Sequence, residues 1–388
     1  MTQMYTNGQL QQLQEQLVKS FQESIQQTQI LNAFRTVPRH AFIEQMYRKQ
    51  KGQWHLMEGS SSERMETIYT NKSLVTQIEN NQPSSSSSQP SLMATMLDAL
   101  DLQQGQRVLE IGTGTGYNAA VMAEIVGPSG RVISIDIDAS LIGKARQRFD
   151  RLEYKNIEVY CAHGLDGYTT ARPYDRIIAT ASFPYIPVSW LDQLAPDGLL
   201  VAPIQTPLAG ALLKVTKGNS GRSAIGTFLD LPYVHFMPLR RTYLPSREDI
   251  SATTSLPFFA TEQCPFDTSI FDTSFDWLFW LHFAFPTARL VWYSRSWKEQ
   301  TLTCPVLLDA TMKTMLIFYP SNQPWSVEIR GEPQAWHRLQ QVYSSWIEAN
   351  RPSLLHYQFQ SDASGTQSVR LNTTQHTAPL WFMYRCPS

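Results

Sequence analysis

The stretch that decides the fold is Val108-Leu109-Glu110-Ile111-Gly112-Thr113-Gly114-Thr115-Gly116-Tyr117. Three glycines at alternate positions follow an apolar run typical of a buried strand, and a segment typical of a helix, 117–126, comes next. Glycine lets the backbone turn sharply and lets a ligand approach where a Cβ would otherwise stand. The start of the helix adds unpaired N–H donors at the same place. We therefore expect a ligand-binding turn, although a plain strand–helix turn could carry the same glycines.

The spacing of the glycines indicates the kind of ligand. It is GxGxG, whereas dinucleotide binders carry GxGxxG with the pyrophosphate at the helix N-terminus. Asp136 ends the next predicted strand, 20 residues after Gly116, where an acid can accept hydrogen bonds from ribose hydroxyls. Asp136 or Asp138 could instead cap the helix that begins near Ala139; we expect Asp136 to bind ribose and Asp138 to cap. The pattern predicts an adenosine-bearing ligand and favours S-adenosylmethionine over NAD.

Strands and helices alternate around this stretch. Five runs are typical of strands: 107–111, 131–135, 157–160, 174–179 and 199–202. Helix-length segments separate most of them, which predicts an α/β fold with a mostly parallel, doubly wound sheet.

The flanking regions differ in texture. Apolar residues at spacings of three or four predict one helix over 9–35, and polar residues predict an exposed loop over 48–66. Eight of the ten tryptophans lie beyond residue 225, which predicts an α+β domain with an aromatic core and a helix from Pro333 to about Asn350. The expected parts are an N-terminal helical segment and loop, the ligand-binding domain and a C-terminal α+β domain: 1–83, 84–222 and 223–388.

Composition excludes several classes of protein. The formal net charge of −1 argues against general binding to nucleic acid, and no apolar run approaches the length of a membrane span. The N-terminus shows no secretory signal, and the four cysteines form no CxxC pair or zinc pattern. We therefore expect no metal, no nucleic acid and no membrane, and a reducing cytoplasmic location; the oligomeric state stays open.

The segment from Tyr69 to about Thr216 resembles the protein-L-isoaspartate O-methyltransferases. Three motifs carry the resemblance: Ser88-Gln89-Pro90 ahead of a helix, the glycine motif up to Ala120, and Pro173-Tyr174-Asp175-Arg176-Ile177-Ile178-Ala179-Thr180-Ala181. Val37-Pro38-Arg39-His40-Ala41-Phe42 is similar to the N-terminal segment of that family. The resemblance implies a Rossmann-like class I methyltransferase domain. It also implies S-adenosylmethionine as cofactor, S-adenosylhomocysteine as product, and a peptide or protein substrate bearing Asp or isoAsp.

The resemblance implies a set of site residues. The expected cofactor-binding residues are Glu110, Gly112, Thr113, Gly114, Thr115, Gly116, Asp136, Ile137, His163 and Gly164. The expected substrate-binding residues are Ser87, Gln89 and Pro90, and the expected catalytic residues are Ser88, Ser86 and Thr180. His163 stands where the family carries an acid that faces adenine. It could equally be a loop histidine without a ligand.

The expected chemistry is a direct displacement. A carboxylate is ionised near pH 7, so it needs positioning and no general base. We expect the Ser88 hydroxyl to donate to one carboxylate oxygen and to aim the other, unless the serine run is only a flexible low-complexity linker. The methyl ester would then close to a succinimide (aspartimide), which hydrolyses to Asp or isoAsp.

Two departures from the family point to a particular substrate. The serine run at 84–88 and the roughly 160 residues after the catalytic unit resemble longer members that act on ribosomally made peptides, such as lanthipeptides or graspetides. We therefore expect esterification of an Asp in a modified precursor peptide, with selection by the C-terminal domain. The alternatives are general isoaspartyl repair, an NAD-dependent oxidoreductase and an inactive binding protein.

Overall fold

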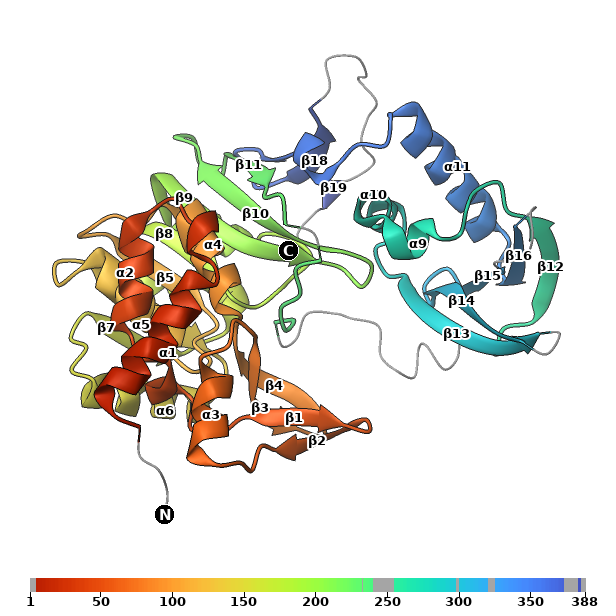
Figure 1. The fold of residues 1–388 in the computed structure, drawn as a ribbon. Coiled ribbons are helices and arrows are strands. Elements are labelled where there is room, and N and C mark those ends of the chain that lie inside the picture. Colours follow the sequence, from red (N-terminus) through yellow and green to blue (C-terminus); the bar gives the residue numbers. More distant parts are fainter. Residues whose placement is uncertain are drawn as a thin grey trace.

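A ten-stranded sheet forms the centre of the molecule (Figure 1). The computed structural model describes residues 5–231, 233–239, 255–297, 300–319, 325–372 and 383–384. The strand order is β7-β6-β5-β8-β9-β10-β11-β17-β18-β19. The parallel half contains β5 (Arg107–Ile111), β6 (Arg131–Asp136), β7 (Ile157–Cys161), β8 (Tyr174–Ala179) and β9 (Leu194–Gln205). The antiparallel half contains β10 (Gly210–Lys217), β11 (Ala224–Phe228), β17 (Tyr357–Ser361), β18 (Gln367–Leu371) and β19 (Met383–Tyr384).

Both faces of the parallel half are buried. Neighbouring residues of one strand belong to different apolar clusters: Val108 packs with the N-terminal helices, and Leu109 packs on the other face. Such continuous apolar strands are typical of a sheet covered on both sides. The connecting helices are α4 (Pro90–Leu100), α5 (Tyr117–Val126), α6 (Ala139–Arg151) and α7 (Val188–Gln193). The predicted doubly wound α/β fold is therefore confirmed.

The single helix predicted over 9–35 is wrong. The chain forms α1 (Asn7–Lys19), a 3₁₀ turn over Gln22–Ser24 and α2 (Thr28–Thr36). The carboxylate of Asp98 accepts a hydrogen bond from the backbone N–H of Gln27 at 3.1 Å, immediately before α2 begins. This partner lies 71 residues away, so the periodicity of the segment could not reveal the break.

The loop predicted over 48–66 is also wrong. Strands β1 (Tyr47–Gln50) and β2 (Gln53–Leu56) form a hairpin, and helix α3 (Ser61–Ile68) follows with Ser60 as its N-cap. Lys51 and Gly52 form the turn, both with positive φ. The hairpin strands are almost entirely exposed, so they lack the apolar alternation by which strands are recognised.

The serine run is a strand and not a flexible linker. Strand β4 (Gln82–Ser87) pairs with β3 (Leu74–Glu79), and together with β1 and β2 they form a four-stranded sheet in the order β2-β1-β3-β4. Ser88 follows the end of β4, and Pro90 begins α4. This paired strand gives the serines fixed directions that the sequence did not reveal.

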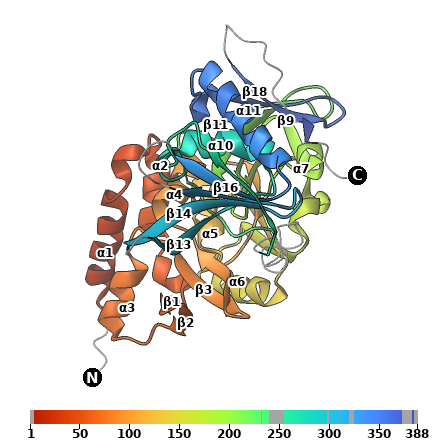
Figure 2. The same ribbon diagram turned by 90° about the vertical axis from the view of Figure 1, so that its right-hand side faces the viewer.

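The C-terminal part forms a second lobe, which faces the viewer in Figure 2. Its antiparallel sheet contains β12 (Phe258–Gln263), β16 (Ser326–Gly331), β15 (Thr314–Tyr319), β14 (Gln300–Asp309) and β13 (Arg289–Trp297), in that order. The helices are α9 (Ile270–Thr273), α10 (Phe275–Ala284) and α11 (Gln334–Glu348), the last of which confirms the helix predicted from Pro333. Trp277 and Trp336 are completely buried, in accord with the predicted aromatic core. Trp381 lies outside the described residues.

The two parts of the chain are joined through the central sheet. Strand β11 pairs with β17, which the chain reaches only after it has passed through the C-terminal lobe. The sheet therefore runs across the boundary expected at residue 222, and one apolar cluster continues from β5 to α10 and α11. Within the part of the chain that the structure describes, no helix is both long and apolar enough to cross a membrane.

Candidate active site

A cavity of about 840 Å³ opens at the carboxyl ends of the parallel strands. Its walls include residues at the ends of four strands: 112–115 after β5, 136–137 at the end of β6, 162–164 after β7 and 180–181 after β8. Strand β5 lies between β6 and β8, so the chain order reverses here. Ligands of open α/β sheets bind at such reversal points.

The glycine loop lies against the end of β8. Gly112 has a φ of +104°, and a Cβ at this position would lie 2.7 Å from Oγ1 of Thr180. The Thr180 hydroxyl donates to the Gly112 carbonyl oxygen at 2.8 Å. Thr180 thus lines the cavity as expected, but its hydroxyl proton is already used to hold the glycine loop.

Asp136 and Asp138 occupy different environments. The Asp138 carboxylate accepts from the backbone N–H groups of Ser140 and Leu141, which confirms its predicted capping of α6. Asp136 lines the cavity, and its carboxylate accepts from the N–H of Gly114 at 3.0 Å and from the N–H of Asp138 at 3.1 Å. These bonds fix the direction of the Asp136 carboxylate at the cavity wall, where ribose binding is expected.

Glu110 is the most deeply buried acid of the site. Its Oε2 accepts from Ser134 Oγ at 2.6 Å, and its Oε1 accepts from Asn118 Nδ2 at 2.8 Å. Burial raises the pKa of Glu110 to about 7 against the opposing effect of these hydrogen bonds, and the nearby Asp136 raises it further. Oδ1 of Asn118 is buried without a hydrogen-bond partner in the described structure. The pair therefore offers a carboxylate and an amide oxygen, which are acceptors suited to an ammonium group.

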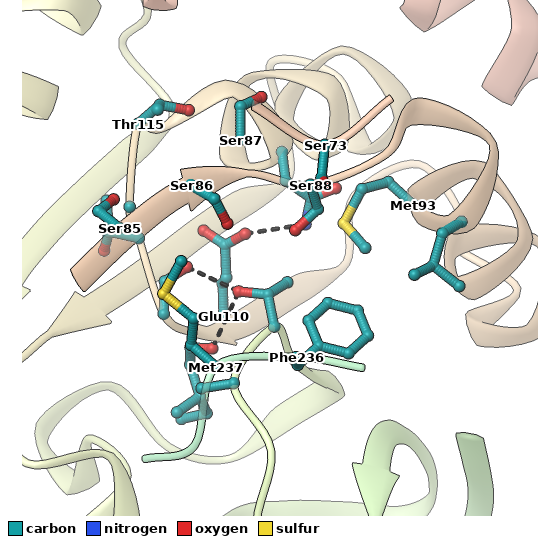
Figure 3. A pocket seen from close by; sticks show the side chains of 18 of the residues that line it. Ser73, Ser85, Ser86, Ser87, Ser88, Met93, Glu110, Thr115, Phe236 and Met237 are labelled. Atoms are coloured by element: carbon teal, nitrogen blue, oxygen red, sulfur yellow. Dashed lines mark hydrogen bonds between the residues drawn. The ribbon is translucent and has the colours of Figure 1, made fainter. Parts of the chain in front are cut away.

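The serine strand forms the wall that faces the glycine loop. A Cβ at Gly114 would lie 3.4 Å from the carbonyl oxygen of Ser86, so β4 passes directly over the loop. Figure 3 shows the Ser86 side chain directed toward Glu110 and the Ser87 side chain directed away. Ser88 is half-buried and lines the same cavity.

The remaining predicted residues divide into two groups. Thr113, Thr115, Ile137, Gly164 and Gln89 all line the cavity. Gly116 and Pro90 are not part of its wall: Gly116 is the N-cap of α5, and Pro90 is the buried first residue of α4. These two residues position their helices, and the cavity wall is formed by their neighbours.

His163 lines the cavity but also has a local structural role. Its Nδ1 accepts from the backbone N–H of Leu165 at 3.3 Å and caps the 3₁₀ turn Gly164–Asp166. In this arrangement the ring carries its proton on Nε2, which leaves one donor. An acid at this place would offer acceptors, so adenine contacts here would differ in polarity from those of the family pattern.

One wall of the cavity was not predicted from the sequence. Residues 233–239 cross the ends of β8 and β9, and the backbone N–H of Ser182 donates to the Met237 carbonyl at 2.9 Å. The N–H of Phe236 donates to Gln205 Oε1 at 3.1 Å. Phe236 and Met237 form the side of the cavity opposite the serines (Figure 3). The only sequence signal was a short apolar run next to two prolines outside any predicted strand.

Alternating glycines, an acid at the end of the second strand and a cavity at the reversal point are the features expected of a class I S-adenosylmethionine-dependent methyltransferase. A family model described as protein-L-isoaspartate (D-aspartate) O-methyltransferase matches residues 10–241. The chain belongs to this family.

Known members are similar over the same region. The protein-L-isoaspartate O-methyltransferase 2 of Archaeoglobus fulgidus is 36% identical over 216 residues, which cover 55% of this chain and 86% of that protein. The protein-L-isoaspartate O-methyltransferase 1 of Syntrophobacter fumaroxidans is 37% identical over 197 residues, or 51% and 80% of the two chains. A solved structure of a protein-L-isoaspartate O-methyltransferase aligns with a TM-score of 0.56 at 21% identity and covers 93% of this chain and 100% of that one. The fold of the C-terminal lobe therefore has a counterpart within a structure of that name.

The residues present fit S-adenosylmethionine. The unpartnered Oδ1 of Asn118 beside Glu110 suits the ammonium group of the methionine part, and Asp136 suits the ribose diol. Together with the family match, this identifies the cofactor as S-adenosylmethionine and argues against an NAD-dependent oxidoreductase.

Proposed function

We propose that this enzyme methylates the free carboxylate of isoaspartyl residues in peptides and proteins. The observation that carries the proposal is the placement of the serine segment. Ser86 and Ser88 lie on the wall of the cavity that faces the glycine loop and Glu110. Hydroxyl donors there can orient an incoming carboxylate, and family membership supplies the substrate class.

The residues of this chain then have separate tasks. When bound, S-adenosylmethionine supplies a methyl group activated by a positively charged sulfur. Ser88 donates to one oxygen of the substrate carboxylate and leaves the other free to attack, and Ser86 is a second donor. Phe236 and Met237 exclude water from the opposite side. Positioning accounts for most of the acceleration, because both reacting groups are already in their reactive states.

The ester then changes the substrate. Methanol leaves more readily than hydroxide, so the backbone N–H of the next residue can attack the ester and close a succinimide. Hydrolysis of the ring gives a mixture of Asp and isoAsp, and repeated cycles convert isoAsp into Asp. No further residue of the enzyme is required for these steps.

A precursor peptide of ribosomal origin is a second candidate substrate. Its support is the C-terminal lobe, where Trp292 and Tyr293 on β13 are exposed, at 46% and 50% of their surface. Aromatic side chains of this kind are frequent anchors in peptide binding. We prefer the isoaspartyl substrate because residues 10–241, which contain the cavity residues discussed above, match the family model of isoaspartyl methyltransferases.

A pair of peptides decides between the two. Peptides of one sequence that carry isoAsp or Asp at a single position are incubated with the enzyme and S-adenosylmethionine. Mass spectrometry then records whether each peptide gains roughly 14 Da, the mass of one CH₂, as expected when a single acceptor oxygen is positioned for methylation. We expect methylation of the isoAsp peptide and none of the Asp peptide. Methylation of only a modified precursor peptide, with loss on Trp292→Ala, would support the second candidate.

The expected cytoplasmic location is part of the proposal. Among the described residues Cys161 and Cys264 are free thiols, and Cys386 lies outside the described residues. Free thiols are typical of a reducing compartment.

A further inference from the structure

Arg39 is a completely buried arginine beneath the serine segment. It begins the 3₁₀ turn Arg39–Phe42, and its side chain is 0% exposed. Its Nη1 donates to the carbonyl oxygens of Ile68 and Thr70 at 2.9 and 2.8 Å. Its Nη2 donates to three acceptors: the carbonyl of Lys72, Oγ of Ser87 and the carbonyl of Ser88, at 2.9, 3.4 and 3.3 Å.

The charge of Arg39 has no ionic partner among the described residues. Every acceptor of its two terminal nitrogens is a carbonyl or a hydroxyl. Burial lowers the pKa of Arg39 to about 10, against small opposing effects of Tyr117 and Tyr69, so the group still carries its charge near pH 7. A buried cation without a counter-ion is costly, and proteins seldom keep one without a use.

The position of this charge suggests its use. The guanidinium lies directly behind the peptide of Ser87 and Ser88, and its carbon lies 5.9 Å from the centre of the Tyr117 ring. Ser87, Ser88 and Tyr117 all line the cavity. Glu110, which would attract the cationic part of the cofactor, lies on the other side of Ser86. A buried cation thus lies behind the cavity wall where the substrate carboxylate is expected, and an anion lines the cavity where the cofactor ammonium is expected.

We propose that Arg39 is a positioning residue that fixes Ser88 and supplies the positive charge that attracts the substrate carboxylate. This inference rests on the proposed function. The five hydrogen bonds hold the loop at 68–72 and the end of β4 in one geometry, which aims the Ser88 hydroxyl. In a site shielded from water, the same charge stabilises a carboxylate that has lost its own hydration.

The test compares a charged and a neutral ligand. One peptide carries isoAsp, and a matched peptide carries isoasparagine, whose amide has nearly the same shape but no negative charge and one acceptor oxygen fewer. Inhibition constants of both are measured for the wild type, Arg39→Met, Arg39→Lys and the control Arg35→Met, which removes a half-buried arginine paired with Glu15 away from the cavity. We expect Arg39→Met to reduce the preference for the charged peptide at least tenfold. Arg39→Lys should keep most of the preference and lower kcat, because an ammonium cannot reach all five acceptors.

Binding of S-adenosylhomocysteine serves as the test of folding. An Arg39→Met protein that binds S-adenosylhomocysteine normally and keeps the wild-type preference and KM would overturn the proposal. Should Arg39→Met not fold, Arg39→Lys decides: a loss of the preference with intact S-adenosylhomocysteine binding contradicts the role of the charge. Failure of the wild type to methylate any isoAsp peptide would instead refute the proposed function itself.

Discussion

The hydroxyl of Ser134 donates a 2.6 Å hydrogen bond to Oε2 of Glu110, a carboxyl group with no exposed surface. Oγ1 of Thr113 lies 2.7 Å from the same Ser134 hydroxyl, so the glycine loop is linked to the acid through one serine. This arrangement holds Glu110 in place while burial raises its pKa to about 7. A carboxyl that titrates near neutral pH beside the expected ammonium site makes cofactor binding sensitive to pH.

Cofactor affinity should rise with pH through the pKa of Glu110. Only the ionised carboxylate attracts an ammonium group, and a pKa of about 7 leaves roughly one tenth of it ionised at pH 6. We expect the Kd of S-adenosylhomocysteine, measured by calorimetry, to tighten about tenfold between pH 6 and pH 8. Glu110→Gln is the control, since any pH dependence of the Kd that remains in this variant reports the titration of the ligand. Equal slopes in both proteins would show that Glu110 does not face the ammonium.

The same carboxyl should make the apoprotein less stable as pH rises. The pKa of Glu110 is raised from its ordinary 4.5 to about 7, so the folded state retains a proton that the unfolded chain has released. Its stabilising contribution is complete below pH 4.5 and is lost as pH rises through 7. Relative to Glu110→Gln, we expect the wild type to lose about 3 kcal/mol of unfolding free energy over this range. Urea titrations of both proteins at pH 5 and pH 8 measure this difference. An equal change in unfolding free energy between the two pH values in both proteins would contradict it.

Removal of the Ser88 hydroxyl should impair methyl transfer and spare cofactor binding. A hydrogen bond to a charged group contributes about 1.5–3 kcal/mol, so Ser88→Ala should lower kcat/KM for an isoAsp peptide about 10- to 100-fold. Ser86→Ala should have a smaller effect, and exposed Ser140 on α6 provides a matched control in Ser140→Ala. Steady-state kinetics with S-adenosylhomocysteine titrations separate the two steps. Unchanged turnover in Ser88→Ala would exclude its orienting role.

A methyl group at Gly112 should disturb the cofactor loop. The backbone there has a φ of +104°, and the new Cβ would lie 2.7 Å from Oγ1 of Thr180. We expect Gly112→Ala to cost about 1–3 kcal/mol of stability and to weaken S-adenosylhomocysteine binding. Gly143 in α6 has open space around it, so Gly143→Ala should instead stabilise the protein by about 0.5–1 kcal/mol. Thermal unfolding with and without S-adenosylhomocysteine compares the two variants. Unchanged stability and ligand binding in Gly112→Ala would show that the loop can shift to accommodate the methyl group.

The parts of the fold that the sequence predicted depend on local patterns. Strands 107–111 and 174–179 are buried on both faces, so their apolar runs are visible in the sequence. Helix α6 begins directly after Asp138, because the side chain of Asp138 accepts from the first N–H groups of the helix. The missed elements depend on partners far along the chain. The break before α2 needs Asp98, and the serines of β4 form a strand only because β3 pairs with them.

The site follows the same division. The glycines, Asp136 and Ser88 belong to motifs with a meaning of their own, and the structure brings them to one cavity. Asn118 and Arg39 lie within motifs that resemble the family, but those motifs assigned neither residue a role, and Phe236 lies in no motif. Their roles arise from burial, from an unpartnered amide oxygen and from a chain segment that crosses the site, and none of these exists before the fold is complete.

The return of β17 and β18 to the edge of β11 has a consequence for biosynthesis. While a ribosome is still translating the tryptophan-rich lobe, the emerging catalytic sheet ends in an open strand whose backbone groups could pair with another nascent chain. Its completion must wait until residues near 371 leave the exit tunnel. The C-terminal strands are therefore an integral part of the catalytic sheet. A chain truncated before β17 would leave β11 as an unpaired edge strand, which is prone to aggregation.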